Sequence, residues 1–237
     1  AKDTFIPVIP AEGFATNLTE GCARGEDEID ILSKVVGYAM CPRSTFGTEE
    51  EKQIALRGAS QFLSASIVRR IAKESPVRPI GIQFEMIDRI RQRLNGKKHA
   101  KFTCFFGGRL NAAKRWKQLV DTYDTFYSAG RPIRIILTAP LPSSPVGIPK
   151  EIEVHTSMST EKFIETCMKS HVYLASSVYE GFSVGFLEQM ATGIVPILPD
   201  LPWAQALMRE RWDTYPFKYK TFDQAYAHLR WSFATMS

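Results

Sequence analysis

Glu180 and Glu188 are separated by seven residues, among which lie Gly181, Gly185 and several apolar side chains. The segment follows a short apolar run, 172–175, and leads into a run typical of a helix. A glycine-bearing turn between a strand and a helix can hold a phosphorylated ligand, because amides at a helix N-terminus point outward with partial positive charge. The carboxylates are about two helical turns apart, so they can bind different hydroxyl groups of one elongated ligand.

A second group of residues suits phosphate chemistry. Gly107 and Gly108 end an apolar run, Arg109 follows them, and Lys114 comes five residues after the arginine. Glycines let the main chain approach a ligand closely, while Arg and Lys neutralise phosphate oxygens as a planar fork and a point charge. Such a pair can stabilise the charge that develops on a diphosphate leaving group. The commoner alternative is a strand-to-helix turn with ordinary surface cations.

The elements that must position these residues begin near residue 100. Short runs rich in branched or aromatic residues and bounded by Gly or Pro predict strands over 102–106, 133–138, 151–155, 172–175 and 194–198. Longer amphipathic runs predict helices over 113–128, 160–169, 184–191, 203–211 and 222–233. This alternation predicts an α/β fold, a Rossmann-like doubly wound parallel sheet covered by helices on both faces.

The first hundred residues have a weaker pattern. We expect helices over 27–38, 48–58 and 66–73, a strand over 61–65 and an extended run over 77–82. Residues 1–82 are assigned to a partial or reduced N-terminal α/β lobe with its crossover, and residues 83–237 to the Rossmann-like domain that carries both groups of candidate residues. About 80 residues are few for a complete domain, so we expect the chain to be a fragment of a longer protein.

Ligands of open parallel sheets bind beyond the carboxyl ends of the strands. Both the turn that holds Gly108 and Lys114 and the turn that holds Glu180 and Glu188 follow predicted strands, so both should open at that edge. Cations beside a pair of carboxylates suit a nucleotide-diphosphate sugar. The cations would bind the diphosphate, and the carboxylates would bind hydroxyl groups of the ribose and the sugar.

Charge is unevenly distributed along the chain. Residues 67–117 hold 14 Lys and Arg against 3 Asp and Glu, while the whole chain has a net charge of +5. A basic stretch of this kind can bind a diphosphate, a nucleic acid backbone or an acidic membrane face. It can equally be the solvated face of a helix, because five of its cations fall within 85–98.

On these residues the sequence resembles the retaining glycosyltransferases of the GT-B fold, in the group with an E-x7-E motif (group 1, family 4-like). The resemblance spans roughly residues 60–210. It includes 60–66, the crossover Pro79-Ile80-Gly81-Ile82, the turn from Gly108 to Lys114, the pair Glu180 and Glu188, and 191–197. Ser183 and Arg115 stand where the family often has glycine, and 200–203 replaces a glycine-rich turn.

The resemblance implies a role for each matching residue. Arg109 and Lys114 would contact the diphosphate beside Gly108 and stabilise the leaving group, and Glu188 would hold the ribose hydroxyls. Glu180 would approach the donor-sugar hydroxyls, with sugar and phosphate contacts from the segment Gly181, Phe182, Ser183 and Val184. The three residues implied in catalysis are Glu180, Arg109 and Lys114. The family needs no metal or other cofactor for this chemistry.

The expected function is therefore transfer of a sugar from a UDP- or GDP-sugar, with retention and without a metal. The acceptor is a sugar, a lipid-linked molecule or a nucleic acid. The alternative is a DNA-binding protein, or a DNA-base glycosyltransferase, that uses the basic stretch 69–117. No apolar run is long enough for a membrane span, and the scattered cysteines are typical of a reduced, cytoplasmic protein.

Overall fold

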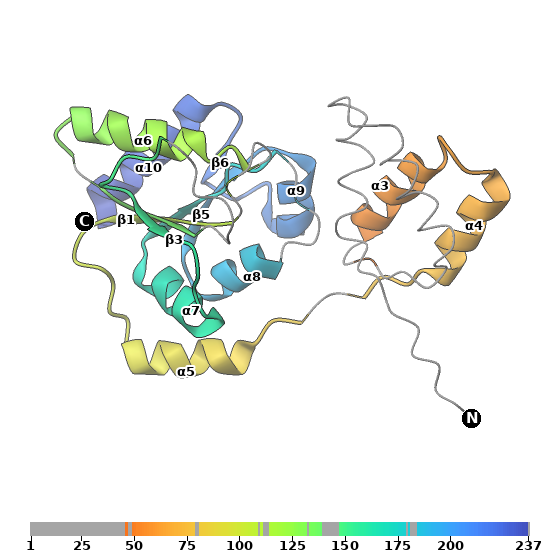
Figure 1. Ribbon diagram of the computed structural model, residues 1–237, viewed down its shortest axis with the longest axis horizontal. Coiled ribbons are helices and arrows are strands. Elements are labelled where there is room, and N and C mark those ends of the chain that lie inside the picture. Colours follow the sequence, from red (N-terminus) through yellow and green to blue (C-terminus); the bar gives the residue numbers. More distant parts are fainter. Residues whose placement is uncertain are drawn as a thin grey trace. The chain divides into compact units, whose positions relative to one another are not determined.

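The computed structural model describes residues 46, 49–78, 81–108, 110, 114–131, 133–138, 147–178, 180 and 184–236. The chain divides into two compact units (Figure 1). The first comprises Ala1–Gly81 with Glu180–Phe182, and the second comprises Ile82–Tyr179 with Ser183–Ser237. Each unit is described by itself.

The second unit is built on a six-stranded sheet in which every pair of neighbours is parallel. The strands are β1 (Thr103–Gly107), β2 (Arg134–Thr138), β3 (Glu153–His155), β4 (Val172–Leu174), β5 (Val195–Pro199) and β6 (Lys218–Tyr219). Their spatial order is β3-β2-β1-β4-β5-β6. The chain therefore winds outward from β1 in one direction, then crosses to β4 and winds outward in the other. This doubly wound order has a topological switch point between β1 and β4.

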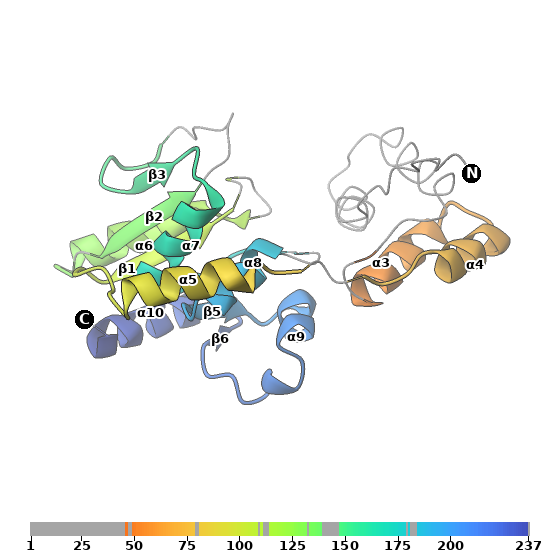
Figure 2. The same cartoon turned by 90° about the horizontal axis from the view of Figure 1, so that it is seen from below.

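Helices cover both faces of the sheet (Figures 1 and 2). Helices α6 (Lys117–Ser128) and α10 (Phe222–Met236) lie on one face, and α7 (Thr160–Lys169) and α8 (Val184–Ala191) lie on the other. Helix α5 (Phe84–Leu94) packs against α7. A short helix, α9 (Pro202–Met208), and a 3-10 turn, η2 (Arg209–Arg211), connect β5 to β6.

The core of this unit consists of apolar strands buried from both sides, as covered parallel sheets require. On the face of α7 and α8, Phe105 of β1 packs edge-on against Phe163, and Tyr173 of β4 packs against Phe186. On the other face, Phe126 of α6 contacts Tyr226 and Phe233 of α10. Both layers are therefore anchored by aromatic side chains, which bury large apolar areas.

The first unit, as far as it is described, contains α3 (Glu49–Ala59) and α4 (Ala65–Glu74). Its small core includes Phe46, Ala55 and Ile71, and Phe46 forms an isolated parallel bridge with Val77. The strand predicted over 61–65 was wrong. Residues 60–64 form the turn between the two helices, in which the amide of Leu63 donates to the carbonyl of Ala59. This turn leaves Phe62 exposed, so the apolar residues of this segment do not mark a buried strand.

The predicted α/β fold class and parallel sheet are confirmed, and the five predicted strands match β1 to β5 within two residues. The predicted helix over 113–128 begins only at Lys117, and the final helix extends to Met236. Strand β6 was not predicted, because two residues are too few for an alternating pattern. The predicted helix over 27–38 lies outside the described residues.

Candidate functional site

The predicted donor-binding residues of the second unit follow the two strands that flank the switch point. Gly108 and Lys114 follow β1, while Glu188 lies on α8, which follows β4. Open parallel sheets bind ligands at this point, because the two chain segments diverge there and leave a crevice. The topology therefore brings the predicted cation and one predicted carboxylate to one edge of one sheet.

Gly107 and Gly108 have different surroundings. A Cβ atom on Gly107 would lie 2.8 Å from Cε2 of Phe163, a distance that packed atoms do not adopt. On Gly108 it would lie 3.8 Å from the ring of Phe106 and 4.0 Å from Cε of Lys114, which are ordinary contacts. Packing within the protein thus requires the first glycine and not the second. Because Gly108 has no side chain, its main chain is accessible beside the side chain of Lys114.

The turns after β1 and β4 are joined by a hydrogen bond. The hydroxyl of Ser176, just beyond β4, donates to the main-chain carbonyl of Lys114 over 2.5 Å. Ser176 is 1% exposed, so its hydroxyl is shielded from water. The main chain at Lys114 is thereby held against the segment that leads from β4 toward α8.

Two aromatic side chains from later in the sequence also donate hydrogen bonds to the segment after β4. The hydroxyl of Tyr219, in β6, donates to the carbonyl of Ala175 over 2.6 Å. The indole Nε1 of Trp203, in α9, donates to the carbonyl of Ser177 over 3.3 Å. Burial raises the pKa of Tyr219 above its ordinary value, so this phenol remains a donor. Sequence patterns gave no indication of these contacts.

Glu188 lies in the second turn of α8 and is half-buried. Desolvation raises the pKa of its carboxyl above the ordinary value. After burial itself, this carboxylate is also the next cause of the raised pKa of the Cys167 thiol on α7. No side chain among the described residues forms an ion pair with Glu188. A carboxylate that is partly desolvated without an ion-pair partner in the described protein is suited to hold a ligand hydroxyl.

The remaining predicted site residues are only partly described. Val184 is the first residue of α8 and is half-buried, while Glu180 is half-buried and belongs to the first unit. Arg109, Gly181, Phe182 and Ser183 lie outside the described residues. Their roles, and the role of Glu180 toward the donor sugar, stay predictions.

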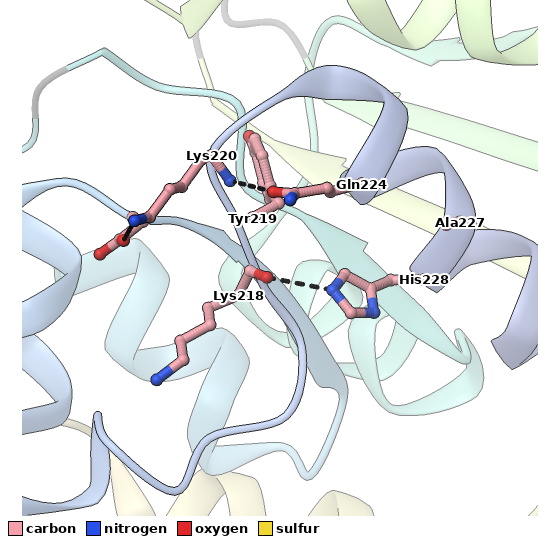
Figure 3. A pocket seen from close by; sticks show the side chains of 7 residues that line it. Lys218, Tyr219, Lys220, Gln224, Ala227 and His228 are labelled. Carbon is pink, nitrogen blue, oxygen red and sulfur yellow. Dashed lines mark hydrogen bonds and ion pairs between the residues drawn. The ribbon is translucent and has the colours of Figure 1, made fainter.

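A cavity of about 340 Å³ lies beside β6 and α10 (Figure 3), and neither Gly108, Lys114 nor Glu188 is among its lining residues. Its lining residues are Asp200, Lys218, Tyr219, Lys220, Gln224, Ala227 and His228. Several polar groups of the lining form hydrogen bonds with one another. Nε2 of His228 donates to the Lys218 carbonyl over 3.0 Å, and the Lys220 amide donates to Oε1 of Gln224 over 2.7 Å. Both lysines are also engaged within the protein: Nζ of Lys218 donates to the carbonyls of Trp212 and Asp213 over 3.0 Å, and Lys220 pairs with Asp200 at 3.8 Å.

Several cations of the basic stretch are bound within the second unit. Arg93 of α5 pairs with Glu161 and Glu165 of α7 at 3.0 and 3.3 Å. Nη2 of Arg91 donates to the Ala191 carbonyl over 2.7 Å, and Nζ of Lys98 donates to the Ser170 carbonyl over 2.8 Å. These side chains fasten α5 and the segment after it to α7 and α8. They are not a continuous row of solvated charges facing an external polyanion.

Within the described ranges, no three His, Cys, Asp or Glu side chains lie close enough to share a metal ion. No helix in the same ranges combines the length and apolar character that are needed to cross a bilayer.

Comparison of the sequence with known proteins gives no relative: no family model matches, and no curated protein matches. Comparison of the structure does give matches. One is a UDP-forming α,α-trehalose-phosphate synthase from Burkholderia vietnamiensis, with a TM-score of 0.59 and 12% identity, covering 86% of this chain and 56% of that one. The apo structure of OtsA matches with a TM-score of 0.59 and 16% identity, covering 87% of this chain and 56% of that one.

A third match is a variant of S. aureus TarM, in complex with Fondaparinux, α-GlcNAc-glycerol and UDP. Its TM-score is 0.60 at 12% identity, covering 86% of this chain and 39% of that one. The likeness shows the fold. This chain has the α/β fold of GT-B glycosyltransferases and spans a little over half the length of the trehalose-phosphate synthases it matches.

Proposed function

We propose that this chain holds the donor-binding part of a glycosyltransferase that uses a nucleotide-diphosphate sugar. The observation that carries the proposal is the hydrogen bond from Ser176 to the carbonyl of Lys114, which joins the turns after β1 and β4 across the switch point. A phosphate bound there would meet the open main chain of Gly108 and the ammonium group of Lys114. The fold shared with UDP-forming and UDP-bound glycosyltransferases supports the same class of ligand.

The chemistry follows from the charges on this edge of the sheet. When the bond between the sugar and the diphosphate breaks, negative charge grows on the diphosphate oxygens. Lys114, and Arg109 by its place in the sequence, would stabilise that charge, as would the amides at the start of α8 near Val184. Glu188 would accept hydrogen bonds from the ribose hydroxyls. Glu180 would hold the hydroxyls of the transferred sugar.

We infer retention of the anomeric configuration, and chemistry without a metal, from the resemblance of the E-x7-E segment to retaining enzymes. In this arrangement the cationic side chains take the place that a metal ion has in other transferases. The acceptor would be a sugar or a lipid-linked molecule, and it would meet the donor through parts of the protein other than the sheet edge described here.

Nucleotide titration tests the proposal. Saturable binding of UDP or GDP to the chain is expected, with affinity about tenfold or more lower in Glu188→Gln, because a hydrogen bond to a charged group is lost. The matched control is Glu161→Gln, which removes a carboxylate on the surface of α7 that pairs with Arg93. Absence of binding to either nucleotide, in a folded chain, would refute the proposal.

Duplex DNA is the alternative ligand, and the structure gives no specific observation in its favour, since Arg91, Arg93 and Lys98 are occupied by their own chain. Titration with DNA at several salt concentrations separates the two ligands. Nucleotide-sugar binding should depend weakly on salt and be sensitive to Glu188→Gln. DNA binding would weaken steeply with salt and be indifferent to that change.

A further inference from the structure

The segment Ala175 to Ser177, directly after β4, forms a hydrogen bond from each of its residues to a different element. Ala175 and Ser177 accept from Tyr219 in β6 and Trp203 in α9, while Ser176 donates to Lys114 after β1. All three residues of the segment are buried. Because three consecutive residues form hydrogen bonds with three different elements, the main chain of this segment has little conformational freedom.

These hydrogen bonds begin where the pairing between β1 and β4 stops. β1 and β4 pair only at Cys104 with Val172 and Phe105 with Tyr173. Beyond these pairs, the described residues Phe106, Gly107 and Gly108 have no ladder contact with β4. The hydrogen bond from Ser176 to Lys114 therefore joins the two sides of the switch point after the sheet itself has ended.

We propose that Ser176 is a positioning residue for the diphosphate end of the donor site, and that Tyr219 and Trp203 hold the segment from which it acts. The inference rests on the proposed function. Ser176 is buried and directs its hydroxyl to a main-chain carbonyl, so it acts on the ligand only through Lys114. Its hydroxyl fixes how far the Lys114 turn lies from the segment leading to α8.

The distance between the two turns matters because a diphosphate must contact both at once. Small displacements of a charged group weaken a directional contact strongly. Loss of the Ser176 hydroxyl leaves the Lys114 carbonyl without this donor and the turn free to move. The effect is confined to the phosphate end, so the nucleoside part of the ligand should be bound as before.

The test compares a nucleotide with its nucleoside. Binding of UDP and uridine, or of GDP and guanosine if GDP binds more tightly, is measured on the whole chain by calorimetry. Ser176→Ala should weaken diphosphate binding roughly three- to tenfold and leave nucleoside binding unchanged. Ser176→Thr, which keeps the hydroxyl, should bind the diphosphate as tightly as the unaltered chain does. Tyr219→Phe, which loses only a hydroxyl, should act in the same direction with a smaller effect.

The matched control is Ser170→Ala. Ser170 is a fully buried serine just before β4, whose hydroxyl donates to the Thr166 carbonyl over 2.8 Å. It lies at the opposite end of the strand from the predicted site. Its loss should lower stability about as much as Ser176→Ala does, without changing the ratio of nucleotide to nucleoside affinity. An equal change of that ratio in both variants would show general loosening and overturn the inference.

A double variant isolates the route of the effect. In a Lys114→Ala background, Ser176→Ala should cause little further loss of diphosphate affinity, because it acts through the lysine. Independent, additive losses would contradict the positioning role. If the unaltered chain binds neither nucleotide, the proposed function and the inference fail together. If it binds and Ser176→Ala has no effect on the diphosphate, only the inference fails.

Discussion

The ring of Phe163 occupies the space into which a side chain on residue 107 would project. The 2.8 Å distance between Cε2 of Phe163 and a Cβ at Gly107 requires one of them to move, and Phe163 is held edge-on against Phe105. Gly107 is therefore a packing glycine of the sheet. Gly108, the next residue, has no such neighbour.

Substitution by alanine should affect stability at Gly107 and ligand affinity at Gly108. Gly107→Ala should cost about 1–3 kcal/mol of stability through overpacking against Phe163. Gly108→Ala should change stability by less than about 0.5 kcal/mol, as accommodated substitutions do, yet weaken nucleotide-diphosphate binding. Urea unfolding and nucleotide titration on both variants measure this. Unchanged affinity in Gly108→Ala would mean that its main chain does not approach the ligand.

Removal of either predicted cation should weaken diphosphate binding without unfolding the chain. Lys114→Ala and Arg109→Ala are each expected to lower affinity roughly ten- to a hundredfold, as losses of charged hydrogen bonds do. Lys117→Ala is the matched control, because Lys117 is an exposed cation at the start of α6. Affinities that stay unchanged in both Lys114→Ala and Arg109→Ala would refute the diphosphate role.

Glu188 should lower the stability of the ligand-free protein at neutral pH. Burial raises its pKa in the folded state, so the folded chain holds this proton more tightly than the unfolded chain does. Stability from this group is present at low pH and lost as pH rises through its folded pKa. Glu188→Gln should thus unfold at a higher temperature than the unaltered protein near pH 7, with the difference vanishing near pH 4. A lower melting temperature in the variant at neutral pH would contradict this account.

Histidines should dominate the acid sensitivity of the sheet. Nδ1 of His99 accepts from Arg134 and Nδ1 of His171 accepts from the Thr103 amide, so both rings are neutral. Burial, followed by the charge of Arg134, lowers the pKa of His99 to about 4. Burial, followed by Lys98, lowers the pKa of His171.

The unfolded chain then binds more protons than the folded chain below the ordinary histidine pKa of about 6.5. Stability is consequently lost as pH falls from about 6.5 toward about 4. His99→Asn keeps an acceptor for Arg134 and removes the titrating group, so its urea midpoint should fall less over this range. Identical pH profiles for the variant and the unaltered chain would show that His99 does not drive the effect.

Much of the sheet could be predicted from the sequence, because buried parallel strands such as β1 and β2 are continuous apolar runs. The two-residue strand β6 could not, since so short an element depends on its neighbours rather than on a pattern. The predicted strand over 61–65 failed for a related reason. The apolar residues Phe62 and Leu63 lie in the turn between α3 and α4, and they resemble a strand as long as that turn is unknown.

The candidate site shows the same division. Spacing and glycine content drew attention to Gly108, Lys114 and Glu188, which the topology brings to the strands that flank one switch point. The hydroxyls of Ser176 and Tyr219 could not be found in this way. A serine or tyrosine that bonds a main-chain carbonyl across the sheet has no local sequence pattern, because its partner lies 62 or 44 residues away in the chain.

The order of elements along the chain has a consequence for biosynthesis. Ala175 and Ser177 depend on Tyr219 and Trp203, which are made after them. A chain that has emerged from the ribosome only as far as residue 202 can pair β1, β2 and β4, yet its segment beyond β4 has neither aromatic support. The sheet edge that faces the predicted ligand therefore takes its final form only after Tyr219 has been added. A nascent chain that stops before Tyr219 would expose this edge without its supporting hydrogen bond from Tyr219.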